Sequence, residues 1–117
     1  GNDGLRGIQV GGTRHNLREI IRKVDAAYPE APVIIAGMRM PPNLGRRFAE
    51  DFASVFPDVA SETGAVLIPF IGEDVAGRDN LLQMDGIHPT ASGHEVIAET
   101  VWKYLKPVLR QHMEMSQ

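Results

Sequence analysis

Apolar residues in the first third of the chain recur at spacings of three and four, the periodicity of an amphipathic helix. The pattern predicts a helix over residues 14–28, with Thr13 as its N-cap and Pro29 just beyond its end. The apolar face of this helix consists of Leu17, Ile20, Ile21, Val24 and Ala27. Pro32 then precedes residues 33–36, an apolar run without polar alternation. Such a run predicts a strand covered on both faces, as in a parallel sheet.

A second helical stripe and a second apolar run follow. The stripe consists of Phe48, Phe52, Val55, Phe56 and Val59. Pro57 should kink this helix or split it into two pieces, and Gly64 should end it. Residues 66–68 then predict a second buried strand.

A third helix is predicted near the end of the chain. Ser92 and Glu95 have the spacing of a capping box, which marks a helix start. The inner face of the helix consists of Val96, Ile97, Val101, Tyr104 and Leu105. Pro107 is expected to end the helix, and we expect the tail over residues 110–117 to be disordered.

The alternation of helix and strand is typical of an α/β domain with a parallel sheet. We therefore expect residues 1–117 to form part of a single domain. Three expected loops, residues 1–12, 37–45 and 70–89, would lie at the carboxyl ends of strands, the first of them after an upstream strand. α/β sheets bind their ligands at that edge. Two strands cannot provide two covered faces for three helices, so we expect the remaining strands to lie outside this chain.

Composition narrows the function classes. The chain has 117 residues, a formal net charge of -3 and no cysteine. It has no basic stripe that would follow a nucleic-acid backbone, and its apolar runs are far shorter than the ~20 residues of a transmembrane helix. Disulfides and cysteine-based zinc sites are excluded.

The unusual polar residues fall in the expected loops. Asp85 and His88 lie three residues apart, so the carboxylate can accept from imidazole Nδ1 while Nε2 faces outward, as in a general base with its orienting group. A helix-capping interaction between the same two residues is the alternative. Asn2 could donate to a developing oxyanion, although an Asn-Asp-Gly sequence is also a common turn.

Taken together, these segments resemble the SGNH, or GDSL-type, hydrolases. The resemblance rests on residues 1–3 (Gly-Asn-Asp) and 85–89 (Asp-Gly-Ile-His-Pro), supported by residues 4–7, 40–45 and 67–70 between them. These segments are similar to the bacterial branch that contains acyl-CoA thioesterase I, lysophospholipase and arylesterase. The resemblance implies a three-layer α/β/α sandwich with a flavodoxin-like parallel sheet, of which this chain would be the C-terminal part.

The resemblance also implies roles for individual residues. Asn2 matches the asparagine that lends an oxyanion donor, and Asp85 and His88 match the family's acid and base. The nucleophilic serine and a glycine donor belong to upstream blocks that this chain does not contain. Leu5, Asn43 and Ile87 are the candidate substrate-binding residues.

The implied function is hydrolysis of small acyl esters and thioesters by a serine enzyme. The complementary N-terminal segment that carries the serine is the expected partner, and no metal or organic cofactor is expected. The location is left open, and the resemblance is compatible with a periplasmic or secreted protein. The alternative hypothesis is that the chain is an inactive fragment that acts as a folding or assembly half.

Overall fold

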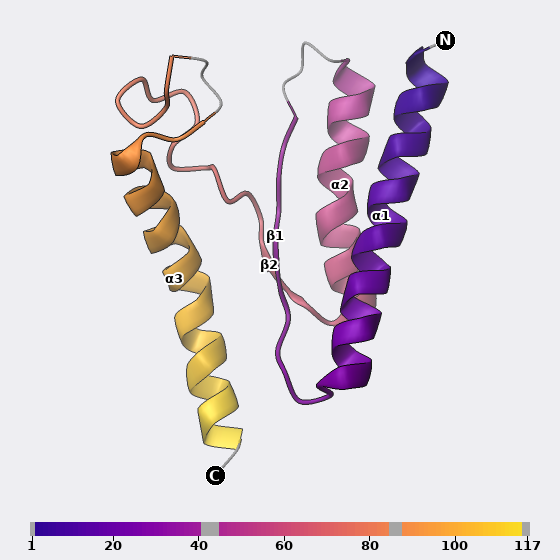
Figure 1. Ribbon diagram of the computed structural model, residues 1–117, viewed down its shortest axis with the longest axis vertical. Coiled ribbons are helices and arrows are strands. Elements are labelled where there is room, and N and C mark those ends of the chain that lie inside the picture. Colours follow the sequence, from indigo (N-terminus) through magenta and orange to yellow (C-terminus); the bar gives the residue numbers. More distant parts are fainter. Residues whose placement is uncertain (1, 41–44, 85–87, 116–117) are drawn as a thin grey trace. The chain divides into compact units, whose positions relative to one another are not determined.

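The computed structural model describes residues 2–40, 45–84 and 88–115, and the side chains from Gln9 onward. The elements are α1 (Asn2–Ala27), β1 (Ile34–Ala36), α2 (Arg46–Thr63), β2 (Val66–Ile68) and α3 (Ala91–Met115) (Figure 1). The chain divides into two compact units, Gly1–Pro69 and Phe70–Gln117. The predicted α/β class is confirmed.

The first unit contains a short parallel sheet. β1 pairs with β2 in the register Ile34↔Val66, Ile35↔Leu67 and Ala36↔Ile68. α2 forms the crossover between the two strands, as a parallel pair requires. Both strands occupy the apolar runs from which they were predicted.

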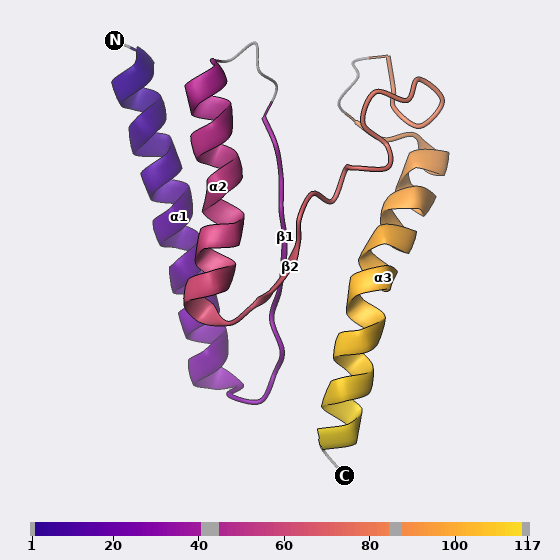
Figure 2. The same ribbon diagram turned by 180° about the vertical axis from the view of Figure 1, so that it is seen from behind.

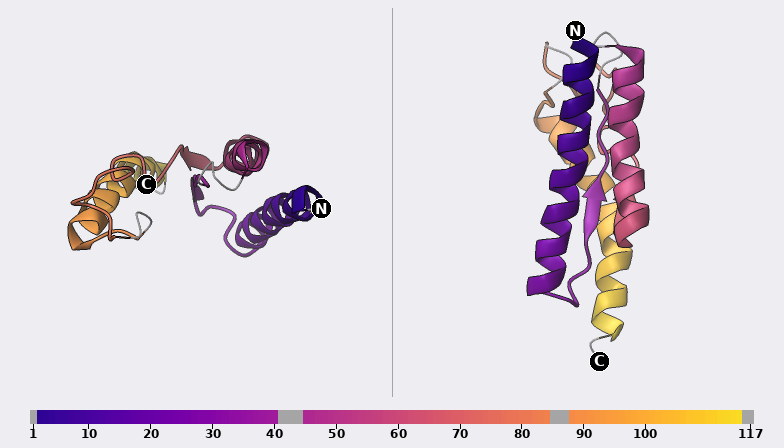
Figure 3. Two further views of the ribbon diagram at one scale, coloured as in Figure 1. Left: turned by 90° about the horizontal axis from the view of Figure 1, so that it is seen from above. Right: turned by 90° about the vertical axis from the view of Figure 1, so that its right-hand side faces the viewer.

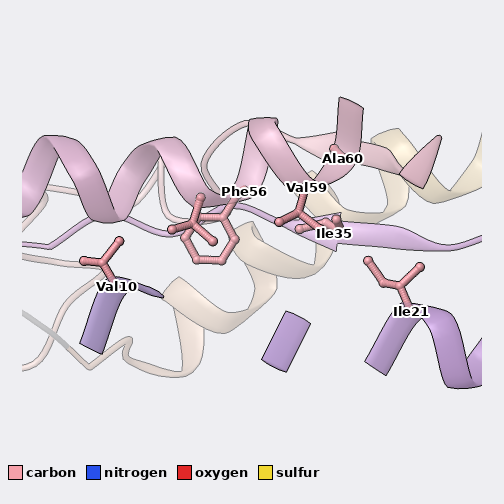
Figure 4. Close-up of a cluster of buried hydrophobic side chains, with 7 residues drawn as sticks. Val10, Ile21, Ile35, Phe56, Val59 and Ala60 are labelled. Carbon is pink, nitrogen blue, oxygen red and sulfur yellow. The ribbon is translucent and has the colours of Figure 1, made fainter. Parts of the chain in front are cut away.

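The core of this unit lies between the sheet and the helices α1 and α2, which run side by side (Figures 2 and 3). Its buried residues come from all three elements and are Val10, Ile21, Ile35, Val55, Phe56, Val59 and Ala60 (Figure 4). Because Ile35 lies in one cluster with residues of both helices, α1 and α2 cover the same face of β1. An aromatic row along α2 adds to the packing, with ring centroids 6.3 Å apart for Phe48–Phe52 and 5.4 Å apart for Phe52–Phe56.

The first helix begins earlier than the sequence indicates. α1 starts at Asn2, so the expected loop over residues 1–12 is wrong for all of its described part. Thr13 does not cap the helix, and its hydroxyl donates to the Gln9 carbonyl oxygen at 2.9 Å within the helix. The physical reason is packing: Val10 is only 8% exposed and extends the buried face of Ile21 by three turns, which outweighs the low helix propensity of the local glycines.

The interior and the C-terminal end of α2 differ in how well the sequence predicted them. Pro57 lies inside one continuous helix, so of the two outcomes expected there, a kink or a split, the split is wrong. Gly64 ends the helix as predicted, with φ of 76° and its N–H donating to the Ala60 carbonyl oxygen at 2.9 Å.

The second unit consists of a segment of turns followed by α3. The N-cap of α3 is Thr90 and not Ser92, because the Gly93 N–H donates to Thr90 Oγ1 at 3.1 Å. Pro107 does not end the helix, since the half-buried positions continue beyond it through Val108 and His112 at helical spacing. Residues 110–115, which we expected to be disordered, belong to α3. No described helix is long and apolar enough to cross a membrane.

Candidate functional site

The carboxyl ends of β1 and β2 meet at one edge of the sheet. Gly37, the residue after β1, donates its N–H to the Ile68 carbonyl oxygen at 2.8 Å. A Cβ at Gly37 would lie 2.8 Å from that same oxygen and closer still to the Pro69 carbonyl oxygen. Glycine therefore allows the two chain segments to leave the sheet in direct contact. These are the segments that lead toward Asn43 and toward His88.

The N-terminal end of α1 and the start of α2 lie at the same end of the first unit, whereas β1 lies at about mid-height along these helices (Figures 1 and 3). Asn2 is the first residue of α1, and Leu5 lies in its first two turns. Their side chains are outside the described part of the chain, and so is Asn43.

His88 lies in a short antiparallel pairing of the second unit. An isolated bridge joins Leu82 to Pro89, and it is flanked by two backbone hydrogen bonds. The Gln83 N–H donates to the His88 carbonyl oxygen at 2.7 Å, and the Thr90 N–H donates to the Leu81 carbonyl oxygen at 2.9 Å. The side chain of His88 is exposed. The two paired segments, residues 81–83 and 88–90, are called the arms below. Asp85 and Ile87 lie outside the described residues.

The pairing is fixed to the start of α3. Thr90 Oγ1 donates to the Asn80 carbonyl oxygen at 3.2 Å while accepting from the Gly93 N–H. Gly93 is buried, and a Cβ there would overlap the Leu81 carbonyl oxygen and lie 3.0 Å from Pro89 Cβ. The first turn of α3 therefore packs directly on the arms that carry His88.

A second anchor holds the earlier part of the same segment. Thr100 is 9% exposed, and its hydroxyl lies 3.1 Å from Asp74 Oδ2 and 3.2 Å from the Val96 carbonyl oxygen. The connection from β2 to α3 is thus tied to α3 at two places. Neither anchor was predicted. A threonine directly before a helix is a known capping signal, and Thr90 could have been identified in this way if the cap had not been assigned to Ser92.

The described serines do not resemble an activated nucleophile. Ser54 lies in α2 and donates to the Asp51 carbonyl oxygen at 2.7 Å, and Ser61 is an exposed residue of the same helix. Ser92 is an exposed residue of the first turn of α3. A nucleophilic serine normally occupies a sharp turn between a strand and a helix, which none of these three positions provides. Within the described residues there is also no cluster of three or more His, Asp or Glu side chains that could hold a metal ion.

A charged contact joins the two helices of the first unit away from these candidates. Arg18 donates to both carboxylate oxygens of Glu62, at 2.6 and 2.7 Å. These hydrogen bonds from Arg18 lower the pKa of the Glu62 carboxyl below its ordinary value. Arg14 makes a second contact of this kind, 2.9 Å from Asp58 Oδ2.

Comparison with known proteins identifies the family. The model of the GDSL-like lipase/acylhydrolase family matches residues 1–96, a range that includes Asn2, Asp85 and His88. The chain belongs to this family.

Relatives of this GDSL-like chain agree with that assignment. It is 39% identical over 109 residues to Esterase TesA of Pseudomonas aeruginosa, covering 93% of this chain and 53% of the relative. It is also 39% identical over 109 residues to Thioesterase 1/protease 1/lysophospholipase L1 of Escherichia coli strain K12, covering 93% of this chain and 51% of the relative. The chain therefore spans about half the length of the curated relatives that it matches.

Solved structures confirm the fold. A crystal structure of TesA matches with a TM-score of 0.78 at 39% identity, covering 91% of this chain and 58% of TesA. The psychrotrophic esterase EstA from Pseudoalteromonas sp., inhibited by monoethylphosphonate, matches with a TM-score of 0.77 at 32% identity, covering 93% and 58%. This GDSL-like chain thus has the α/β fold of the SGNH hydrolases, as the sequence resemblance implied.

Proposed function

We propose that the intact protein, meaning this chain together with its complementary N-terminal segment, hydrolyses small acyl esters and thioesters. The observation that carries the proposal is the family match over residues 1–96, which contains the Asn2 and Asp85–His88 segments in one alignment. The named activities of the relatives, esterase and thioesterase, support the substrate class.

The chemistry proceeds through an acyl-enzyme. His88 accepts the proton of the serine hydroxyl as its oxygen bonds to the acyl carbon, and the carbonyl electron pair becomes an oxyanion. Asn2 donates to that oxyanion, and Asp85 holds the imidazole in the tautomer that accepts at Nε2. The carbonyl then re-forms, the bond to the leaving oxygen or sulfur breaks, and His88 returns the proton to the leaving group. Water then attacks the acyl carbon of the acyl-enzyme while His88 accepts a proton from it. The bond to the serine oxygen breaks, His88 returns the proton to that oxygen, and the acid is released.

In this proposal the substrate contacts come from three separate positions, Leu5 in α1, Asn43 after β1 and Ile87 before α3. Leu5 and Ile87 supply apolar surface for the acyl chain, and Asn43 supplies a polar group near the reacting carbonyl. No metal or organic cofactor takes part, because the serine, the imidazole and the oxyanion donors together perform acyl transfer.

The complementary segment supplies the serine and further strands of the sheet. The described sheet has two strands, fewer than the about 4 to 6 that are usual in a sheet. Crossovers between parallel strands are right-handed in nearly all proteins. Because α1 and α2 cover the same face, a parallel strand that leads into α1 must lie beside β1, on the side away from β2. We therefore assign the free edge of β1 to the complementary segment, and we propose that residues 1–117 alone are an inactive part of one domain.

The test is the turnover of the intact protein on a p-nitrophenyl acyl ester and on an acyl-CoA. His88→Ala should lower kcat by several powers of ten, and Asn2→Ala by about 10²- to 10³-fold, the usual effect of removing one oxyanion donor. His15→Ala, which alters an exposed histidine of α1, is the matched control and should leave kcat unchanged. Turnover near the wild-type value in His88→Ala would contradict the proposal.

A further inference from the structure

We propose that Gln83 is a positioning residue that sets the direction of the His88 side chain, an inference that rests on the proposed role of His88 as the base. Gln83 contacts two successive carbonyl groups of the opposite arm. Its backbone N–H donates to the His88 carbonyl oxygen at 2.7 Å, and its side-chain Nε2 donates to the Pro89 carbonyl oxygen at 3.2 Å. One residue thus holds the peptide groups on both sides of Pro89.

The side-chain hydrogen bond of Gln83 reaches a carbonyl oxygen that the backbone of the opposite arm does not reach. Leu82 and Pro89 face each other between the two flanking backbone bonds, in a position where neither residue exchanges N–H···O bonds with the other. Proline is accepted there because its missing N–H is not required. The Pro89 carbonyl oxygen points away from the other arm's backbone for the same reason. The Gln83 amide supplies the donor for that oxygen.

The arm that carries Gln83 is itself held firmly. Leu81 is 5% exposed, and its carbonyl oxygen accepts from the Thr90 N–H at 2.9 Å. The absence of a side chain at Gly93 lets α3 press against Leu81. Gln83 therefore connects the backbone of His88 to a buried residue and to a helix, and this connection fixes the Cα–Cβ direction of His88.

The consequence for catalysis follows from geometry. A general base must lie within hydrogen-bond reach of the proton that it takes, and a misplacement of 1 Å can cost about 10²-fold in rate. Loss of only the side-chain bond leaves the backbone bond in place, so the displacement is smaller. We expect Gln83→Met, which keeps the length of the side chain and removes its donor, to lower kcat by about 10-fold with KM within about twofold.

The experiment measures kcat and KM of the intact protein on p-nitrophenyl butyrate. Each value is divided by the number of sites that an organophosphonate ester labels at the end point, so that unfolded protein does not count. Gln83→Lys restores a side-chain donor and should recover most of kcat at the plateau of its pH profile. Gln111→Met makes the same chemical change at an exposed position of α3 and should behave as the wild type.

The outcomes separate this inference from the proposed function. A kcat loss per labelled site in Gln83→Met, recovered in Gln83→Lys and absent in Gln111→Met, supports the positioning role. Unchanged kcat per labelled site in Gln83→Met, with His88→Ala inactive, overturns the positioning role alone. Failure of Gln83→Lys to recover any of the lost kcat also overturns it, because the donor is then not what matters. An active His88→Ala variant overturns the proposed function, and the positioning role with it.

Discussion

Arg18 of α1 and Glu62 of α2 form a two-point contact, with Nε donating to Oε2 at 2.6 Å and Nη2 to Oε1 at 2.7 Å. The two residues are 44 positions apart, and the pair lies on the solvent side of the contact between the helices. It favours one register of α1 against α2, because two parallel hydrogen bonds between a planar guanidinium and a planar carboxylate restrict their relative geometry.

The Arg18–Glu62 pair should make stability depend on pH. Because the Glu62 pKa is lower in the folded protein than its ordinary value of 4.5, the contribution of the pair is fully present above that value. It is lost as the pH falls through the lowered pKa. Thermal unfolding of wild type and Glu62→Gln at a series of pH values is the measurement. The difference in Tm should be present at pH 7 and should shrink toward zero in acid, whereas a constant difference would contradict the assignment.

Gly37 should not tolerate a side chain. Its hypothetical Cβ meets two backbone oxygens, of Ile68 and Pro69, which cannot rotate away as a side chain could. We expect Gly37→Ala to lower the free energy of unfolding by about 1–3 kcal/mol, the usual range for overpacking. Denaturant unfolding of the intact protein measures this. Gly72→Ala, where the neighbouring atoms belong to the Phe70 ring, is a useful comparison and should cost less.

Gly11 and Gly12 should tolerate alanine and even favour it. Both are exposed residues inside α1, and at both the position that a Cβ would occupy has no neighbouring atom within 4 Å. Alanine reduces the backbone entropy that folding costs, so each substitution should raise stability by roughly 0.5–1 kcal/mol. A loop was expected here from the sequence; in a loop that required positive φ at these glycines, the same substitutions would destabilise the protein. The sign of the change in Tm therefore tests the helix directly.

The two hydroxyl residues at the start of α3 should differ. Thr90 accepts from the Gly93 N–H and donates to the Asn80 carbonyl oxygen, so Thr90→Ala should cost about 1 kcal/mol or more. Ser92→Ala should have little effect, because Ser92 is not the cap. Thermal unfolding of the two variants beside the wild type is the measurement. Equal losses in the two variants would favour the capping box that the sequence predicts.

Features encoded by neighbouring residues were predictable from the sequence. The β-branched runs predicted both strands, and Gly64 predicted the end of α2, because each depends on the residues at that position. The start of α1 was missed because Val10 gains its burial from α2, more than 40 residues further along the chain. The split at Pro57 was wrongly expected because the core packing of Val55, Phe56 and Val59 spans that position of α2. Pro107 likewise lies inside α3, which continues to Met115.

The same distinction applies to the candidate site. Asp85 and His88 stand out because their spacing is itself a chemical signal. Gln83 does not stand out, because its role depends on the antiparallel pairing that brings Pro89 opposite Leu82. The hydroxyl of Thr100 has no sequence signal either, since its partner Asp74 is 26 residues away.

The location of the acylated serine is the most direct test of the account. The intact protein is treated with an organophosphonate ester, digested, and the labelled peptide identified by mass spectrometry. We predict a single label on a serine outside residues 1–117, and no label in His88→Ala under the same conditions. A label on Ser92, or on any other serine of this chain, would contradict the claim that this chain contributes the proton shuttle while another segment contributes the nucleophile.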